Sequence, residues 1–194
     1  GILVGFREKR NSYITNLDNC MTLDHRIARL LPSLNSLINS LSIREKVPQI
    51  EVAAGDRDIA LVLRHLKAFS TRDQEVLVNY GQSNRIQCYL QPGGTDSIWC
   101  LTPTEVPMLE YGLENGKIKI QFSPTDFTQV NHRVNQLMVE AAVEELEPGG
   151  QDRILDLFCG VGNFSLPLAK RVAEVHGVEN VPALVDRGMK NAKL

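Results

Sequence analysis

The sequence predicts two fold classes in one chain, α/β plus α+β. Residues 1–122 carry short β-type segments, turn residues and two helical patterns, which together predict an α+β central domain with an antiparallel sheet. From residue 151 the pattern alternates strand and helix, as in a parallel sheet with crossover helices. Residues 123–150 lie between them as a connecting segment and a helix. We therefore expect domains at 1–122 and 151–194.

The first part of the chain predicts a strand, a turn and a strand over residues 2–16, with the turn at Arg10-Asn11-Ser12. Asp24 is a candidate N-cap because a carboxylate can accept a hydrogen bond from the first free N–H groups of a helix. Apolar residues then recur at helical spacing from Ile27 to Leu41. Pro32 should bend or divide this helix, since proline lacks an N–H group.

A hairpin and a second helix complete the middle of the predicted central domain. Residues 49–54 and 59–64 are short strands on either side of Gly55-Asp56, and Ser70 begins a helix that carries Val76 and Leu77. Further strands are predicted at 85–90, 97–101, 107–111 and 117–122. Turn sequences rich in glycine, proline and asparagine separate these strands.

The connecting helix is predicted from Asn131 and ends before Pro148-Gly149-Gly150. Its apolar residues recur with a period of 3.6 and predict one buried face: Val134, Leu137, Met138, Ala141, Ala142 and Leu146.

Composition limits the class of protein. At 194 residues with 43% hydrophobic content the chain can bury a core, and no apolar run approaches the about 20 residues that cross a bilayer. We expect a soluble cytoplasmic protein that has no obligate protein partner and no contact with a membrane. The net charge of -2 lacks the basic excess of many nucleic-acid-binding domains, although basic residues can still cluster locally.

The ends of the chain suggest a fragment. The chain starts at Gly1 without an initiating methionine, inside a strand-like run, and stops at Leu194 inside a helical pattern. We expect it to be a piece of a longer protein.

The segment that carries chemistry begins at residue 153. An apolar strand with Asp156 near its end runs into Cys159-Gly160-Val161-Gly162-Asn163, a helix follows to about residue 171, and a second strand closes with Glu179. Glycine allows a tight turn and a close approach of the backbone to a ligand. Where a strand meets a helix, such a turn predicts a ligand site at the carboxyl end of the sheet.

Two ligands compete for this turn. A dinucleotide-binding site has a third glycine at the position that Ser165 occupies here. The pyrophosphate of a dinucleotide would also be repelled by Asp156. A cationic sulfonium nucleoside suits the carboxylate better, while Glu179 can accept hydrogen bonds from two ribose hydroxyls. The residues favour a methyltransferase, and nicotinamide-dependent oxidoreduction or an ordinary β-α-β turn stay open.

Two motifs carry a resemblance to a known family. The run Ile154-Leu-Asp-Leu-Phe-Cys-Gly-Val-Gly-Asn-Phe-Ser-Leu-Pro-Leu-Ala169 resembles the first cofactor motif of the uracil-5 RNA methyltransferases. Upstream, Phe127-Thr-Gln-Val-Asn131 resembles the F-x-Q-x-N segment that precedes the same domain. The resemblance implies that residues 151–194 are the truncated start of a Rossmann-like SAM-dependent methyltransferase domain. The best fit is the iron–sulfur-containing branch that methylates uridine 1939 of 23S ribosomal RNA, and transfer RNA relatives tend to have proline where Val130 stands.

The resemblance also implies the site residues. Gln129, Phe158, Asn163 and Glu179 match the positions that contact S-adenosyl-L-methionine: Gln129 would bind the methionine end, Phe158 would lie along the ligand, and Asn163 would supply a polar group beside the turn. The simpler interpretations are a polar loop residue for Gln129 and core packing for Phe158. Phe127 is a candidate to line the pocket of a target base taken out of its stack, with core packing as the alternative.

Cys20 matches the position of a fourth ligand to a 4Fe-4S cluster, whose other ligands would lie before Gly1. Without the resemblance, Cys20 would be read as a buried thiol, as Cys88 and Cys100 are.

No catalytic residue is expected within the chain. In the family a cysteine thiolate adds to carbon 6 of uracil, so that carbon 5 can attack the methyl group. That cysteine and the base that removes the proton would lie after Leu194, and Cys159 belongs to the turn instead. The fragment is therefore expected to be inactive. The remaining alternatives are a transfer RNA or other-site ribosomal RNA enzyme, an oxidoreductase, and a module in which residues 1–122 only dock RNA.

Overall fold

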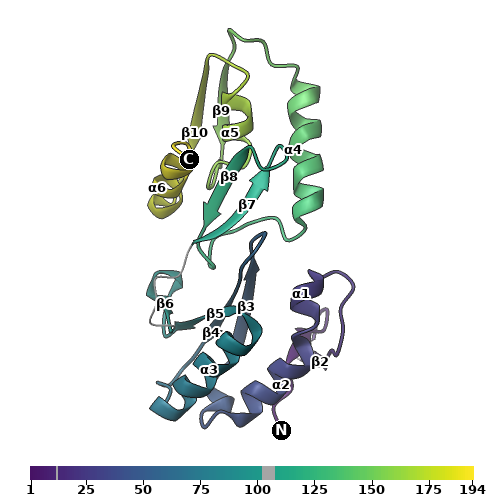
Figure 1. Ribbon diagram of the computed structural model, residues 1–194, viewed down its shortest axis with the longest axis vertical. Coiled ribbons are helices and arrows are strands. Elements are labelled where there is room, and N and C mark those ends of the chain that lie inside the picture. Colours follow the sequence, from purple (N-terminus) through teal and green to yellow (C-terminus); the bar gives the residue numbers. More distant parts are fainter. Residues whose placement is uncertain (12, 102–107) are drawn as a thin grey trace. The chain divides into compact units, whose positions relative to one another are not determined.

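The computed structural model describes residues 1–11, 13–101 and 108–194, and it divides the chain into two compact units, Gly1–Pro107 and Met108–Leu194 (Figure 1). The division comes before residue 109, whereas the sequence suggested a boundary after residue 122. The reason is that the hairpin over residues 109–122 pairs with itself and packs in the second unit. In the described part of the chain, every helix is too short or too polar to cross a membrane.

The first unit contains two sheets and two long helices. Its elements are β1 (Gly5–Arg7), β2 (Ile14–Asn16), α1 (His25–Ala28), α2 (Leu31–Ser40), η1 (Arg44–Lys46), β3 (Gln49–Ala54), β4 (Ile59–Arg64), α3 (Thr71–Asn84), β5 (Ile86–Gln91), η2 (Thr95–Ser97) and β6 (Trp99–Cys100). The predicted strand pair at the N-terminus is confirmed, since β1 and β2 are antiparallel; Ser12 of its turn lies outside the described residues.

The predicted helix after Asp24 is divided, as Pro32 suggested. The Asp24 side chain accepts a hydrogen bond from the Arg26 N–H at 2.8 Å and caps α1. Pro32 lies in the first turn of α2, where a missing N–H group costs nothing. The Ser70 hydroxyl and Asp73 form a capping box at the start of α3, which confirms that start.

The main sheet of this unit is mixed, and the prediction of an antiparallel sheet is wrong at one pair of strands. The order is β3-β4-β5-β6; β4 and β5 are parallel, and the other two pairs are antiparallel. Parallel neighbours need a crossover between them, and the 14 residues of α3 supply it. β4 is consequently buried along most of its length, as expected for a central strand.

The core of the first unit lies between this sheet and its helices. Deeply buried members of this core come from α2 and the residue after it, from β4, from α3 and from β5: Ile38, Leu41, Leu61, Leu63, Leu77, Cys88 and Leu90. Cys88 is fully buried, which fits its reading as a small apolar residue.

The second unit contains a hairpin, a parallel strand pair and three helices. Its elements are β7 (Leu109–Leu113), β8 (Ile118–Phe122), α4 (His132–Leu146), β9 (Arg153–Leu157), α5 (Ser165–Ala169), β10 (Glu174–Val178) and α6 (Pro182–Asn191). β9 and β10 are parallel, so the predicted strand–helix alternation is confirmed. α5 packs against β10 and α4, and α6 packs against β8 (Figure 1). Pro107, which the prediction placed in the strand of β7, lies outside the described residues.

α4 begins where it was expected to begin, but it buries a different face from the one predicted. The Asn131 side chain accepts a hydrogen bond from the Val134 N–H at 3.0 Å. The buried residues of the helix are Asn135, Val139 and Val143. The apolar face that the sequence predicted as buried is exposed here, with Val134 at 56% and Leu137 at 53% exposure. α4 packs against α5, and its His132 ring lies 5.5 Å from the Tyr111 ring of β7.

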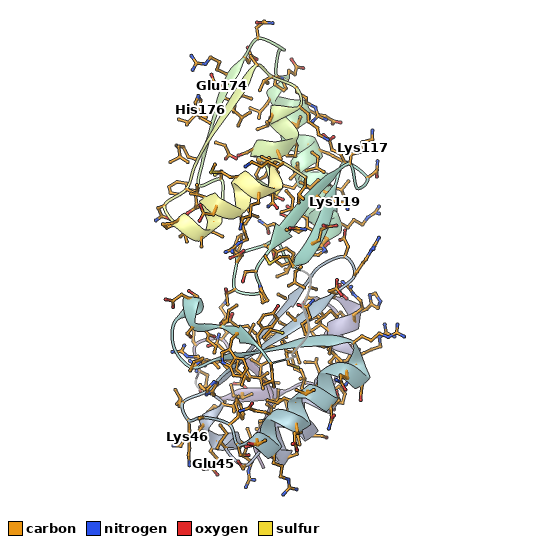
Figure 2. The ribbon with its side chains drawn as sticks, turned by 60° about the vertical axis from the view of Figure 1, so that its left-hand side comes forward. Glu45, Lys46, Lys117, Lys119, Glu174 and His176 are labelled. Carbon is orange, nitrogen blue, oxygen red and sulfur yellow. The ribbon has the colours of Figure 1, made fainter. Side chains whose placement is uncertain are left out.

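Exposed polar side chains of β9 and β10 contact one another at the surface. Glu174 contacts Arg153 at 2.6 Å and His176 at 2.8 Å, and the hydrogen bond from Arg153 lowers the pKa of Glu174 (Figure 2). Water screens such pairs, so they add little to stability.

Candidate functional site

The turn between β9 and α5 has an unusual backbone. Phe158, Gly160 and Gly162 all have positive φ values, +62°, +56° and +100°. Glycine adopts this conformation without a Cβ clash, whereas Phe158 adopts it at a cost of about 1 kcal/mol. A Cβ on Gly160 would meet no atom within 4 Å, so the turn is open at this point. Phe158 is 84% exposed, so it does not pack in a core within the described residues.

Two carboxylates lie at the carboxyl ends of the parallel strands. The register pairs Asp156 with Gly177 and Leu157 with Val178, which brings the ends of β9 and β10 to one edge. The Ser165 hydroxyl donates to Asp156 at 2.5 Å, and the Gly160 N–H donates to Glu179 at 3.1 Å. The Cys159 thiol lies near both: burial, then Asp156, then Glu179 raise its pKa. The two carboxylates therefore share one neighbourhood beside the turn.

The Glu179 carboxylate is held by backbone groups. One oxygen accepts from Gly160, and the other accepts from the N–H groups of Asn180 and Val181 at 2.8 and 3.0 Å. A carboxylate offers about four acceptor positions. A ribose diol that binds Glu179 through two hydroxyls would thus displace one of these backbone donors.

Cys159 and Gly177 pack against each other across the strand pair. A Cβ built on Gly177 would lie 2.8 Å from the Cys159 sulfur and 3.3 Å from the Ser165 hydroxyl oxygen. The thiol therefore fills the space that a side chain at position 177 would need. Its raised pKa keeps Cys159 protonated at neutral pH, which agrees with a packing role rather than a nucleophilic one.

Asn163 ends the turn, and its side chain is bonded within the protein. Its amide exchanges two hydrogen bonds with the Asn135 amide on α4, at 2.9 and 3.0 Å, and the Tyr111 hydroxyl on β7 donates to its oxygen at 2.9 Å. The sequence suggested Asn163 as a polar group beside the turn, but it gave no indication of these two partners.

Gln129 and Phe127 lie on the loop between β8 and α4. Both are exposed, with Phe127 at 82%. Asp126 anchors the loop, because its carboxylate contacts Arg187 of α6 at 2.5 and 2.6 Å and accepts from the Ser123 N–H at 2.7 Å. Asn135 anchors the other end through Asn163. Gln129 is therefore carried between two fixed points, one on α6 and one at the Gly-rich turn.

Cys20 belongs to the first unit, whereas the glycine turn belongs to the second. It is half-buried, and its sulfur lies 3.1 Å from the Thr22 hydroxyl, whose hydrogen bond lowers the pKa of the thiol. Among the described residues, no three His, Cys, Asp or Glu side chains gather as a metal site. A single thiol does not hold a four-iron cluster, so these residues by themselves do not fit that group.

Comparison with protein families gives a match over residues 4–193 to the family described as tRNA (Uracil-5-)-methyltransferase. The chain belongs to this family. The glycine turn, the two carboxylates and the loop with Gln129 all fall within the matched region.

Two relatives within the uracil-5-methyltransferases illustrate the similarity. The chain is 49% identical over 191 residues to the 23S rRNA (uracil(1939)-C(5))-methyltransferase RlmD of Nitrosococcus oceani, with 98% of this chain and 42% of that protein covered. It is 44% identical over 193 residues to the enzyme of the same name from Burkholderia pseudomallei, with 100% of this chain and 41% of that protein covered. The chain thus spans less than half the length of these relatives.

A solved structure supports the fold. The Pyrococcus abyssi tRNA (uracil-54, C5)-methyltransferase, in complex with S-adenosyl-L-homocysteine, superposes with a TM-score of 0.71. The sequence identity is 17%, and the match covers 98% of this chain and 49% of that one. The mixed α/β fold of this chain is therefore similar to that of the matched part of this solved structure.

Proposed function

We propose that the chain is part of an enzyme that transfers a methyl group from S-adenosyl-L-methionine to carbon 5 of a uridine in 23S ribosomal RNA. The geometric observation that carries the proposal is that Asp156 and Glu179 both lie beside the open glycine turn, where Ser165 donates to the first and Gly160 donates to the second. A nicotinamide dinucleotide would bring its pyrophosphate to this acidic edge, which disfavours the oxidoreductase alternative.

The charge of these residues supports this cofactor. Glu179 would bind the ribose hydroxyls, Phe158 would lie along the ligand, and Gln129 would bind the methionine end. Asn163 would act at the end of the turn, and Asp156 would keep the surroundings of the sulfonium negative. When bound, the cofactor supplies an electrophilic methyl group on a positively charged sulfur.

A titration tests the cofactor assignment. Calorimetry with S-adenosylhomocysteine and, separately, NAD is performed on the whole protein that contains this chain. We expect binding of the first alone. Glu179→Gln should weaken binding at least tenfold, because hydrogen bonds to a charged group contribute about 1.5–3 kcal/mol. Glu174→Gln, on the exposed surface of β10, is the matched control and should bind as the wild type does. Preferential binding of NAD would reverse the assignment.

The RNA target is proposed from the relatives. Enzymes named for uracil 1939 of 23S ribosomal RNA are 44–49% identical to the chain over nearly all its length. The family description names transfer RNA, so the second candidate is a transfer RNA uridine. Labelled methyl transfer to a 23S RNA segment that contains uridine 1939, compared with a transfer RNA, separates the two. Phe127, exposed on the anchored loop, would stack on the extruded base.

Three further points belong to the same proposal. The 194-residue chain alone would transfer no methyl group, because the family's nucleophilic cysteine matches no residue within it.

Cys20 would contribute one ligand to a 4Fe-4S cluster whose other ligands lie outside this sequence. The enzyme would act in the cytoplasm, where bacterial ribosomal RNA is found, without a membrane or an obligate protein partner.

A further inference from the structure

Three hydrogen bonds converge on the side chain that ends the Gly-rich turn. The amides of Asn163 and Asn135 donate to each other's oxygens, at 3.0 and 2.9 Å, and the Tyr111 hydroxyl donates to the Asn163 oxygen at 2.9 Å. Asn135 comes from the first turns of α4, and Tyr111 comes from the middle of β7. Three separate elements therefore meet at one amide.

The two partners of Asn163 are deeply buried. Asn135 is 2% exposed and Tyr111 is 3% exposed. The other inward positions of α4 are Val139 and Val143, so Asn135 is the polar member of an apolar face. A buried amide costs free energy unless its hydrogen bonds are made, and valine would pack at this position without that cost. The presence of asparagine at position 135 is explained by its hydrogen bonds to Asn163, at the end of the turn.

Packing holds the Tyr111 ring in place, and burial keeps its hydroxyl protonated, so the hydroxyl can donate a hydrogen bond. Its ring lies 5.7 Å from the Phe122 ring and 5.5 Å from the His132 ring. Burial raises the pKa of the Tyr111 hydroxyl, which stays protonated over the physiological range. The turn is also held from α6, since the Asn191 amide donates to the Val161 carbonyl at 3.0 Å.

These bonds limit what Asn163 can offer to a ligand. A carbonyl oxygen has two acceptor positions, and both are taken, by Asn135 and by Tyr111. One of the two N–H groups of the amide is also used. What is left is a single N–H, which can donate to an oxygen of a ligand and cannot accept from one.

We propose that Asn135 and Tyr111 are positioning residues of the cofactor site, which hold Asn163 so that the Gly160–Gly162 turn is formed before the ligand arrives. Asn163 then contributes at most one N–H donor, directed to an oxygen acceptor such as a carboxylate or a hydroxyl group. This inference rests on the proposed function for the identity of the ligand. The contacts that carry it are independent of that identity.

The test combines affinity, stability and hydrogen exchange on the whole protein. Asn135→Ala and Tyr111→Phe should each weaken S-adenosylhomocysteine binding about three- to tenfold, the effect of one hydrogen bond. Val139→Ala removes a residue equally buried one turn further along α4 and is the matched control. It should lower the melting temperature while affinity stays unchanged. The double variant Asn135→Ala/Asn163→Ala should bind no more weakly than Asn163→Ala, because Asn135 acts through Asn163.

Hydrogen exchange separates this inference from the proposed function. In the absence of any ligand, Asn135→Ala should speed amide exchange at Gly160–Gly162 several-fold more than Val139→Ala does. Equal exchange in the two variants, or equal loss of affinity in both, overturns the positioning role. A double variant that binds more weakly than Asn163→Ala also overturns it. A wild-type protein that binds no S-adenosylhomocysteine but shows the exchange difference overturns the proposed function and supports the positioning role.

Discussion

Removal of Arg187 should destabilise the second unit strongly, because it leaves a buried carboxylate without its cation. Asp126 is 6% exposed and Arg187 is 22% exposed, and two contacts of 2.5 and 2.6 Å join them. In Arg187→Ala the carboxylate keeps only the Ser123 N–H as a donor. Loss of one partner of a buried pair costs about 3–5 kcal/mol. Since Arg187 is partly exposed, we expect about 3 kcal/mol, or roughly a hundredfold in the folding equilibrium.

Urea unfolding followed by far-UV circular dichroism measures this effect. Circular dichroism is preferred to tryptophan fluorescence because Trp99, the single tryptophan of this sequence, lies in the first unit. Arg153→Ala is the control: its contact with Glu174 is equally short, at 2.6 Å, but its side chain is 71% exposed, and we expect almost no change. Hydrogen exchange at residues 123–131 should rise in Arg187→Ala alone.

A second substitution decides whether the orphaned charge is the cause. Asp126→Asn keeps an acceptor for the Ser123 N–H and removes the negative charge. Asp126→Asn/Arg187→Ala should therefore be more stable than Arg187→Ala. If the double variant is no more stable than the single one, or if Arg153→Ala costs as much as Arg187→Ala, the reasoning from burial is refuted.

Three other predictions concern acid stability, strain and thiol reactivity. The hydrogen bond from Arg26 lowers the pKa of Asp24 in the folded state. The ionised Asp24 carboxylate therefore stabilises the fold above its unfolded pKa, near 3.8, and this stabilisation is lost as the pH falls through the lower folded pKa. Asp24→Asn should accordingly make stability depend less on pH in that range. Phe158→Gly should leave the free energy of unfolding unchanged or raise it by up to about 1 kcal/mol, because the residue has φ +62° and is exposed, while it weakens S-adenosylhomocysteine binding; a clear loss of stability would contradict this. Cys159, whose pKa is raised by burial and by two carboxylates, should react more slowly with iodoacetamide at pH 8 than a model thiol does, and equal rates would refute the assignment.

Local chemistry made much of the fold predictable from the sequence. Asp24 caps its helix as expected, and Ser70 and Asn131 cap helices that were expected to begin there, because a short polar side chain before an apolar periodic run can accept from free N–H groups. The β9–β10 pair and its glycine turn were likewise predictable, since alternation of strand and helix leads to parallel pairing.

Features that depend on partners distant in the sequence were not predictable. The strand pattern of β4 and β5 is compatible with either direction, and their parallel pairing follows from the crossover that α3 makes between the end of β4 and the start of β5. The apolar period of α4 indicated a face rich in leucine and methionine, yet the face that is buried carries Asn135. A polar residue at helical spacing with valines was the one available signal for the contact with Asn163.

In the candidate site, too, features set by the local sequence were predictable and features set by distant partners were not. The turn, Asp156 and Glu179 could be located from the sequence, because glycines and carboxylates at strand ends have a direct chemical meaning. The roles of Tyr111 and Arg187 could not, since each acts on a residue more than 50 positions away in the chain.

The contact between Gly177 and Cys159 links two positions that are 18 apart in the sequence. Any side chain at position 177 must find its room at position 159, so neither residue can change freely while the other stays. Natural variants of this protein should therefore enlarge position 177 only together with a smaller residue at position 159. The thiol could be removed by Cys159→Gly combined with Gly177→Ala, because the first change opens the space that the second fills. The Ser165 hydroxyl, 3.3 Å from the new Cβ, would have to shift slightly.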